Sequence, residues 1–234
     1  MCTVSFVKNK NGVIMTSNRD EKITRPVALP PEIYVADQKK IVFPEDPLSG
    51  GSWFTTDEKG NTAVLLNGAK QKHISRGSYR KSRGLILLEL IKAASPITHW
   101  TTINLENIEP FTVMLFQASE LYLLRWNGHH RETTSLEADR NHILSSSTLY
   151  TKALQKQREQ WFFDFMARNR PVSPETLLSF HLYTEKEDKK NGLVIDRGNL
   201  LKTLSITQCI IKKDSVTMHY RQLFPNEKLS TVQL

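Results

Sequence analysis

The chain opens with Met1-Cys2-Thr3-Val4-Ser5-Phe6-Val7, and a second apolar stretch, Val13-Ile14-Met15-Thr16-Ser17, leads directly into Asn18-Arg19-Asp20-Glu21. Asn11-Gly12 lies between the two stretches, and this dipeptide is typical of tight β-turns. We therefore predict a β-hairpin with strands at residues 4–7 and 13–17. Such a hairpin would return the charged tetrapeptide at residues 18–21 to the side of Cys2.

Cys2 is the candidate nucleophile of this region. An initiator methionine is normally removed when the next residue is small, so we expect Cys2 to become the first residue of the mature chain. Its free α-amine, with a reference pKa of about 7.7–8.0, would then accept the proton of its own thiol. Arg19 would lower the pKa of the thiol, and Asp20 or Glu21 would hold the α-ammonium group. The alternative is a small buried cysteine next to a surface ion-paired turn.

Further motifs follow one another along roughly residues 1–165. They are Met1-Cys2-Thr3, Asn18-Arg19-Asp20-Glu21, Gly50-Gly51-Ser52-Trp53-Phe54 with residues 60–67, Ser82-Arg83-Gly84-Leu85, Pro110-Phe111 and residues 144–150. In this order they resemble the NRDE family, which is also called the transport and Golgi organisation family. Single motifs of this kind are unspecific, and their order along the chain carries the resemblance.

The N-terminus of that family is similar to the N-terminal nucleophile hydrolases of the bile salt hydrolase and penicillin V acylase type. This resemblance implies an α+β fold, a four-layer αββα sandwich, and cleavage of a linear, non-peptide amide C–N bond. The chain departs from the pattern in three places. Asp20 directly follows Arg19 instead of standing three residues later, Ser146 replaces an asparagine, and the strand at 203–210 lacks the late arginine of the acylases.

Asn67 is a further candidate catalytic residue, because it ends an apolar strand and precedes Gly68, where a ligand could approach the backbone. Its side-chain amide would donate to the oxyanion, a contact worth about 2.7–4 kcal/mol in a transition state. The alternative is a strand-ending Asn-Gly turn. The candidates for substrate binding are Asn18, Glu21, Trp53 and Ser146, although Trp53 would equally suit the core.

Composition favours one globular α+β domain over residues 1–234, with 39% hydrophobic and 24% charged residues. No apolar run approaches the length that spans a bilayer, and no secretory signal is recognisable, so we expect a cytoplasmic protein. The two cysteines, Cys2 and Cys209, do not make a disulfide framework. Phosphate-binding glycine loops and zinc-type spacings are missing from the sequence, so neither a metal nor a resident cofactor is expected.

The net charge of +8 raises the question of an anionic partner. The densest basic stretch comprises Lys70, Lys72, Arg76, Arg80, Lys81 and Arg83. No nucleic-acid motif accompanies it, so a solvated loop and helix start is favoured and no nucleic-acid partner is expected. The alternative is a basic rim that attracts an anionic small-molecule substrate carrying a carboxylate, a phosphate or a haem propionate. The sequence leaves the oligomeric state open.

The remaining pattern predicts alternating strands and helices. Hairpins are expected at 53–56 with 62–67, at 112–116 with 121–126, and at 205–211 with 217–221. Helices are expected at 82–94, 150–168 and 173–183. The proline-rich segment 24–47 is interpreted as a loop with a short strand at 40–43. The continuous apolar run at 63–66 indicates a strand that is buried on both faces, as a sandwiched sheet requires.

Two functions are compatible with these features. The first is an N-terminal cysteine hydrolase that forms a thioester on Cys2. The second is a non-catalytic binding or transfer protein of the same fold for haem, lipid or acyl-CoA, in which haem would be bound cargo and Cys2 either its thiolate ligand or a structural residue.

Overall fold

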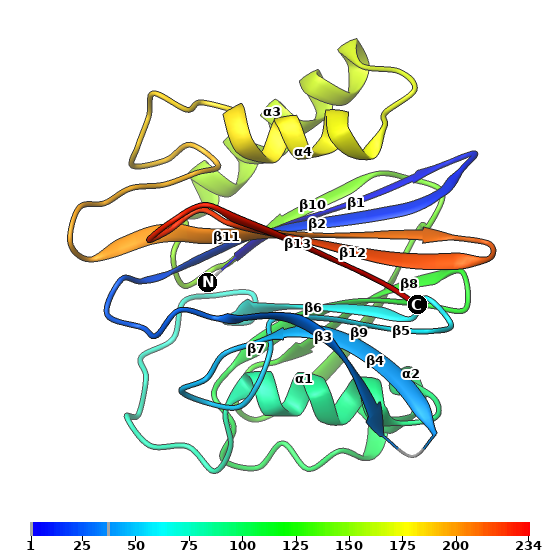
Figure 1. Ribbon diagram of the computed structural model, residues 1–234. Helices are drawn as coiled ribbons and strands as arrows, with labels where there is room; N and C mark the ends of the chain where they lie inside the picture. Colours follow the sequence, from blue (N-terminus) through cyan, green and yellow to red (C-terminus); the bar gives the residue numbers. More distant parts are fainter. Residues whose placement is uncertain (1, 37) are drawn as a thin grey trace.

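Two large antiparallel sheets lie face to face, and each carries a pair of helices on its outer side (Figure 1). In the computed structural model the described residues are 2–36 and 38–234, and at Cys2 they include the backbone only. The four layers run helices, sheet, sheet, helices, which confirms the predicted αββα sandwich. Apolar faces of both sheets are buried against one another, as layered packing around one core requires.

The first sheet contains the N-terminal hairpin, and its strand order is β10-β1-β2-β11-β12-β13. The strands are β1 (Cys2–Asn9), β2 (Gly12–Lys22), β10 (His142–Ser145), β11 (Leu201–Lys212), β12 (Ser215–Gln222) and β13 (Lys228–Gln233). The second sheet follows the chain order from β3 to β9. Its strands are β3 (Leu29–Ala36), β4 (Lys39–Glu45), β5 (Phe54–Asp57), β6 (Thr62–Asn67), β7 (Phe111–Gln117), β8 (Glu120–Trp126) and β9 (Arg131–Leu136).

The helices begin at hydroxyl-bearing N-cap residues. They are α1 (Arg83–Lys92), α2 (Pro96–Thr102), α3 (Lys152–Arg168) and α4 (Pro174–Tyr183). Their caps are Ser82, Ser95, Thr151 and Ser173, and each cap oxygen accepts a backbone N–H three residues later. Helices α1 and α2 cover the second sheet, whereas α3 and α4 cover the first (Figure 1). Over the described ranges, no helix combines the length and apolarity needed to cross a membrane.

Strand β2 shows how one segment serves two cores. Met15 belongs to the large core between the sheets, whereas its neighbour Ile14 packs with Phe162 and Phe180 beneath α3 and α4. Successive side chains of a strand point to opposite faces, so a strand in a sandwiched sheet is buried on both faces, as β2 is from Val13 to Asp20. The uniform burial of β6, predicted from its sequence, has the same cause.

The predicted hairpins and the three predicted helices are confirmed within a few residues at their ends. The interpretation of residues 24–47 as mainly loop is wrong, since β3 and β4 occupy most of this segment. Pro30 and Pro31 lie in β3, which is an edge strand, and an edge strand tolerates residues that cannot donate to a sheet. Helix α2 and strands β9, β10 and β13 were not anticipated.

Candidate functional site

The N-terminal hairpin places the backbone of Cys2 directly opposite Arg19, and that of Thr3 opposite Asn18. The prediction that the charged tetrapeptide returns to the side of Cys2 is therefore confirmed. The side chain of Cys2 and all of Met1 lie outside the described residues, so loss of Met1 and the nucleophilic role of Cys2 stay predictions. The site is built from their described neighbours.

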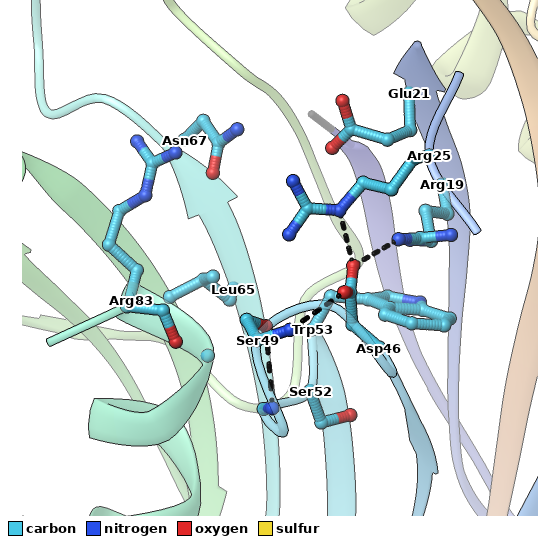
Figure 2. A pocket seen from close by; sticks show the side chains of 13 residues that line it. Arg19, Glu21, Arg25, Asp46, Ser49, Ser52, Trp53, Leu65, Asn67 and Arg83 are labelled. Carbon is cyan, nitrogen blue, oxygen red and sulfur yellow. Dashed lines mark hydrogen bonds and ion pairs between the residues drawn. The ribbon is translucent and has the colours of Figure 1, made fainter. Parts of the chain in front are cut away.

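A small pocket of about 100 Å³ lies beside this end of the hairpin (Figure 2). It lies between the end of β2, the loop that joins β4 to β5, the end of β6 and the start of α1. The lining residues are Arg19, Glu21, Arg25, Asp46, Ser49, Gly51, Ser52, Trp53, Leu65, Asn67, Ser82, Arg83 and Gly84. Three of the predicted site residues besides Arg19, namely Glu21, Trp53 and Asn67, thus meet in one place.

Asp46 holds two arginines on one side of the pocket. Its Oδ2 accepts from Arg19 Nη2 at 2.6 Å and from Arg25 Nε at 2.6 Å, as the dashed lines in Figure 2 show. The Arg19 guanidinium also lies over the ring of Trp53, with 4.2 Å between the guanidinium carbon and the ring centroid. Burial works to raise the pKa of Asp46, but the hydrogen bond and charge of Arg25 and the charge of Arg19 outweigh it, so the pKa lies below its usual value.

The opposite side of the pocket carries Arg83 and Asn67, whose side chains lie next to each other in Figure 2. Arg83 is the first residue of α1, and its Nη2 lies 3.0 Å from Glu109 Oε2. Burial lowers the pKa of Arg83, while the charge of Glu109 works against that shift. No hydrogen bond joins the Asn67 side-chain amide to another described residue, so this amide is available to a ligand.

Glu21 faces the pocket from the end of β2 (Figure 2). Burial works to raise its pKa, but a hydrogen bond from the Lys22 backbone N–H and the surrounding positive charges, including Arg19 and Arg25, lower it below the usual value. Glu21 is therefore ionised near neutral pH. It is a carboxylate on the pocket side of the strand that pairs with β1.

The wall between the pocket and α1 depends on two glycines. A Cβ atom on Gly51 would lie 2.6 Å from the Gly84 carbonyl carbon, and a Cβ on Gly84 would lie 2.8 Å from the Ser52 amide nitrogen. Both distances are shorter than real Cβ contacts, so only glycine lets these backbones approach. The Gly51–Gly84 contact sets the distance between the start of α1 and the loop that carries Trp53.

Asp20 lies on the other face of β2, against α3 and α4. Its carboxylate accepts from Tyr150 Oη at 2.5 Å and from Thr203 Oγ1 at 2.7 Å, and it has no exposed surface. Burial raises the pKa of Asp20, although the charge of Arg158 and these two hydrogen bonds work against the shift. The structure therefore does not bring the described carboxylate of Asp20 into the pocket, and its predicted contact with the α-amine stays untested.

Asn18 is likewise buried on the helix side. Its Nδ2 donates to the backbone carbonyls of His181 and Leu193 at 3.1 and 2.9 Å, and its Oδ1 contacts His181 Nδ1. Ser146 also lies outside the pocket, and its hydroxyl donates to the Asn67 carbonyl at 2.7 Å. Ser146 thus fixes the backbone of a pocket residue, whereas Asn18 joins β2 to the helix layer.

Arg158 of α3 is the largest polar side chain in this buried layer. It donates to Thr3 Oγ1 at 2.5 Å and to the carbonyls of Gly192 and Asn191 at 2.5 and 3.0 Å, and it lies over the Tyr150 ring. Nearby, Ser5 Oγ and His181 Nε2 are 2.7 Å apart. Burial, helped by the charge of Arg158, lowers the pKa of His181 to about 3, so this histidine is neutral.

Sequence reasoning missed Arg25, Asp46 and Arg158 as parts of these clusters, and it treated Arg83 only as part of a motif and a basic stretch. Asp46 and Arg25 lie in the proline-rich segment that was interpreted as a loop, so no strand pattern pointed to them. In the described parts of the chain, no group of three or more His, Cys, Asp or Glu residues is arranged to hold a metal ion.

The sandwich and its N-terminal hairpin define the fold of the N-terminal nucleophile hydrolases. A cysteine-to-alanine variant of conjugated bile acid hydrolase from Clostridium perfringens superposes with a TM-score of 0.57 and 10% identity, over 100% of this chain and 92% of that one. An arginine-to-leucine variant of the same enzyme gives 0.62 and 12%, over 99% and 92%. The N-acylethanolamine-hydrolyzing acid amidase ortholog of Caenorhabditis elegans gives 0.63 and 11%, over 89% and 92%.

Residues 1–219 match the model of the Transport and Golgi organisation 2 family, and the chain belongs to this family. The family resemblance deduced from the motif order is thereby confirmed. A comparison with curated protein sequences finds no significant match.

Proposed function

We propose that this protein is an N-terminal cysteine hydrolase that cleaves a linear, non-peptide amide bond. The observation that carries the proposal is the backbone pairing of Cys2 with Arg19 at the edge of a polar pocket. The neighbours of the same fold add support, because they are named as hydrolases of conjugated bile acids and of N-acylethanolamines.

In the proposed mechanism, Met1 is first removed, and the α-amine of Cys2 takes the proton of the thiol. The thiolate attacks the amide carbonyl carbon, and the resulting oxyanion accepts a hydrogen bond from the Asn67 side-chain amide and from a backbone N–H. The C–N bond then breaks, the α-ammonium gives its proton to the leaving amine, and a thioester remains. Water hydrolyses the thioester, and the thiol is restored.

The charged residues of the pocket would prepare these steps. Arg19 would favour the thiolate, although its positive charge is partly neutralised by Asp46, whose Oδ2 lies 2.6 Å from Arg19 Nη2. Of the two carboxylates considered for the α-ammonium group, Glu21 is the one that lines the pocket, and Asp20 bonds to Tyr150 and Thr203 instead. We therefore assign Glu21 the larger part in holding the ammonium group, with Asp20 supporting the strand from the other face.

The first test is intact mass of the purified protein before and after brief iodoacetamide treatment at neutral pH. We expect loss of Met1 and one fast alkylation at Cys2. Cys209 provides an internal control, because burial raises the pKa of its thiol to about 11 and it should stay unmodified. Retained Met1 with a slow Cys2 would contradict the proposal.

A screen of acyl amides then tests turnover. Hydrolysis that disappears in both Cys2→Ala and Cys2→Ser, while both variants keep the wild-type unfolding midpoint, would support the mechanism. Full turnover in Cys2→Ala would exclude it, since no other residue in the mechanism forms the thioester.

The alternative function, binding or transfer of haem, lipid or acyl-CoA as cargo, stays a prediction. The described lining of the pocket contains no histidine, methionine or tyrosine, so Cys2 would have to supply the haem ligand. A thiolate-type haem spectrum that vanishes in Cys2→Ala, together with no amide turnover, would favour this function over hydrolysis.

A further inference from the structure

A second hollow region lies on the other side of Asn67 from the pocket. It consists of three adjoining cavities of about 310, 450 and 270 Å³, and Lys70 lines all three. We call it the Lys70 groove, and it is lined by residues 66 and 68–73, the Asn127–His130 turn with Arg125 and Glu132, and residues 144–152 at the start of α3. Its side chains do not include Arg19, Glu21 or Trp53.

The charge of the groove is strongly one-sided. Four of its side chains are permanent cations, namely Lys70, Lys72, Arg125 and Lys152, and the carboxylate that lines it is Glu132. Glu132 lies 2.7 Å from Lys70 and 3.6 Å from Arg125. In the described chain no ion pair is formed by Lys72 or Lys152.

In the pocket beside Cys2, negative charges offset most of the positive ones. Its three arginines face Asp46, Glu21 and Glu109, so the described positive charges there are largely compensated. The groove therefore carries more uncompensated positive charge than the pocket. Low-dielectric walls around such a cluster concentrate its attraction for anions.

The backbone that carries Lys70 is held in place, which distinguishes the groove from a patch of loose surface lysines. Gly68 donates its N–H to Pro110 O at 3.0 Å and accepts from Thr112 Oγ1 at 2.9 Å. Gly68 has φ +83, and a Cβ there would lie 2.5 Å from Ser147 Oγ. This close approach joins the start of the loop to the segment that leads into α3.

Arg125 provides a directional donor in the groove. Its side chain is 18% exposed, and its contact with Glu132 is long at 3.6 Å. A planar guanidinium presents paired N–H donors whose geometry matches two oxygens of a phosphate group, and lysines add charge around it. One arginine with lysines on both sides suits a phosphate better than a single carboxylate.

We propose that the Lys70 groove binds the phosphate group of a soluble small molecule. Arg125 contacts the phosphate oxygens, and Lys70, Lys72 and Lys152 neutralise its remaining charge. This binding does not depend on amide cleavage, so it stands or falls separately from the function proposed for Cys2.

The test is calorimetric titration of the full chain with inorganic pyrophosphate at low ionic strength. Wild type should bind saturably, and Arg125→Gln and Lys152→Gln should each weaken binding roughly tenfold. Lys213→Gln is the matched control, because Lys213 is an exposed lysine in the β11–β12 turn and its loss changes net charge equally. Lys152 is exposed at the start of α3, where a cation opposes the helix dipole, so its removal should not unfold the helix.

Three results of the calorimetric titrations would overturn the proposal. They are no saturable pyrophosphate binding by wild type, equal weakening in Lys213→Gln, and unchanged binding in Arg125→Gln. Co-sedimentation with vesicles of phosphatidylcholine and phosphatidylglycerol tests whether the groove binds the phosphate of a lipid headgroup instead of a soluble phosphate. Co-sedimentation with these vesicles without any binding of soluble pyrophosphate would also contradict the proposal, since it would identify general membrane attraction.

Discussion

The two faces of β2 are built on different principles, although their residues alternate in one short stretch. On the helix side, Asn18 and Asp20 have no exposed surface, and their polar atoms bond to partners in the helix layer and in β11. On the pocket side, Arg19 and Glu21 line a cavity and carry charges that a ligand can reach. The comparison teaches that the tetrapeptide combines two tasks, since the strand period of two sends Asn18 and Asp20 into the helix layer and Arg19 and Glu21 toward the pocket.

Replacing the buried arginine should show the largest effect on the helix side. Arg158→Met removes the donors to Thr3 and to two backbone carbonyls, and it leaves the carbonyls of Asn191 and Gly192 without their donor, while Thr3 Oγ1 keeps its contact with Ser145 Oγ. We expect a loss of about 3–5 kcal/mol in the free energy of unfolding, measured by urea titration at pH 7. Arg168→Met, at the exposed end of the same helix, is the control and should change it by less than about 0.5 kcal/mol. Equal effects of the two changes would refute the structural role of Arg158.

Acid should weaken the same layer through His181. The pKa of His181 is about 3 in the folded protein and 6.5 in an unfolded chain, so the unfolded state binds the extra proton first as pH falls. Stability should therefore drop between pH 6.5 and pH 3, with about 2 kcal/mol lost from pH 7 to pH 5. His181→Gln should lack this part of the pH dependence, whereas His130→Gln, at an exposed turn, should retain it. Parallel curves for wild type and His181→Gln would count against the burial of a neutral histidine.

Asp20 should show a smaller effect with the opposite dependence on pH. In Asp20→Asn one oxygen acceptor is kept, but an NH2 group replaces the other oxygen and faces a hydroxyl that donates to the carboxylate in the wild type. We therefore expect the free energy of unfolding to fall by about 1–2 kcal/mol near pH 5. Burial raises the pKa of Asp20 above 3.8, so its contribution to stability falls as pH rises through that raised value. The difference between wild type and Asp20→Asn should accordingly shrink toward alkaline pH, as urea titrations between about pH 4 and pH 8 would show. A difference that grows with pH would contradict a raised pKa.

The pocket side should give the smallest effect on stability. Glu21→Gln and Asn67→Ala remove groups that line a cavity, so each should change the free energy of unfolding by less than about 0.5 kcal/mol. Activity should respond instead, with a loss of about 10²–10³-fold in kcat for Asn67→Ala if its amide stabilises the oxyanion. A large loss of stability in either variant would show that the two faces do not differ in the way described.

The adjacency of Cys2 and Arg19 could be predicted because a tight turn fixes the register of a hairpin from local sequence alone. The division between Arg19 with Glu21 and Asn18 with Asp20 also follows from alternation. Which face would hold the pocket could not be deduced, since β2 is buried on both sides as far as Asp20 and its polar residues fall on both faces.

Other parts of the site depend on contacts between distant segments. Asp46 joins Arg19 across a separation of 27 residues, and Arg158 reaches Thr3 across 155. A helix pattern predicts that Arg158 lies on a helix but does not identify the strand against which that helix packs. The two prolines of β3 hid the strand pair that precedes Asp46, because proline in a central strand would be unfavourable and the edge position was unknown.

The contact between Gly51 and Gly84 makes the width of the pocket harder to change by mutation than the chemistry of its lining. Side chains around it, such as Leu65 or Arg83, can be exchanged to alter polarity and shape without moving the chain. The width of the pocket is fixed more firmly, because the backbones of Gly51 and Gly84 already touch and a side-chain atom added to either glycine would force α1 outward. The chemistry of the lining should therefore be easy to alter, whereas a wider cavity demands coordinated rebuilding of a helix and a loop.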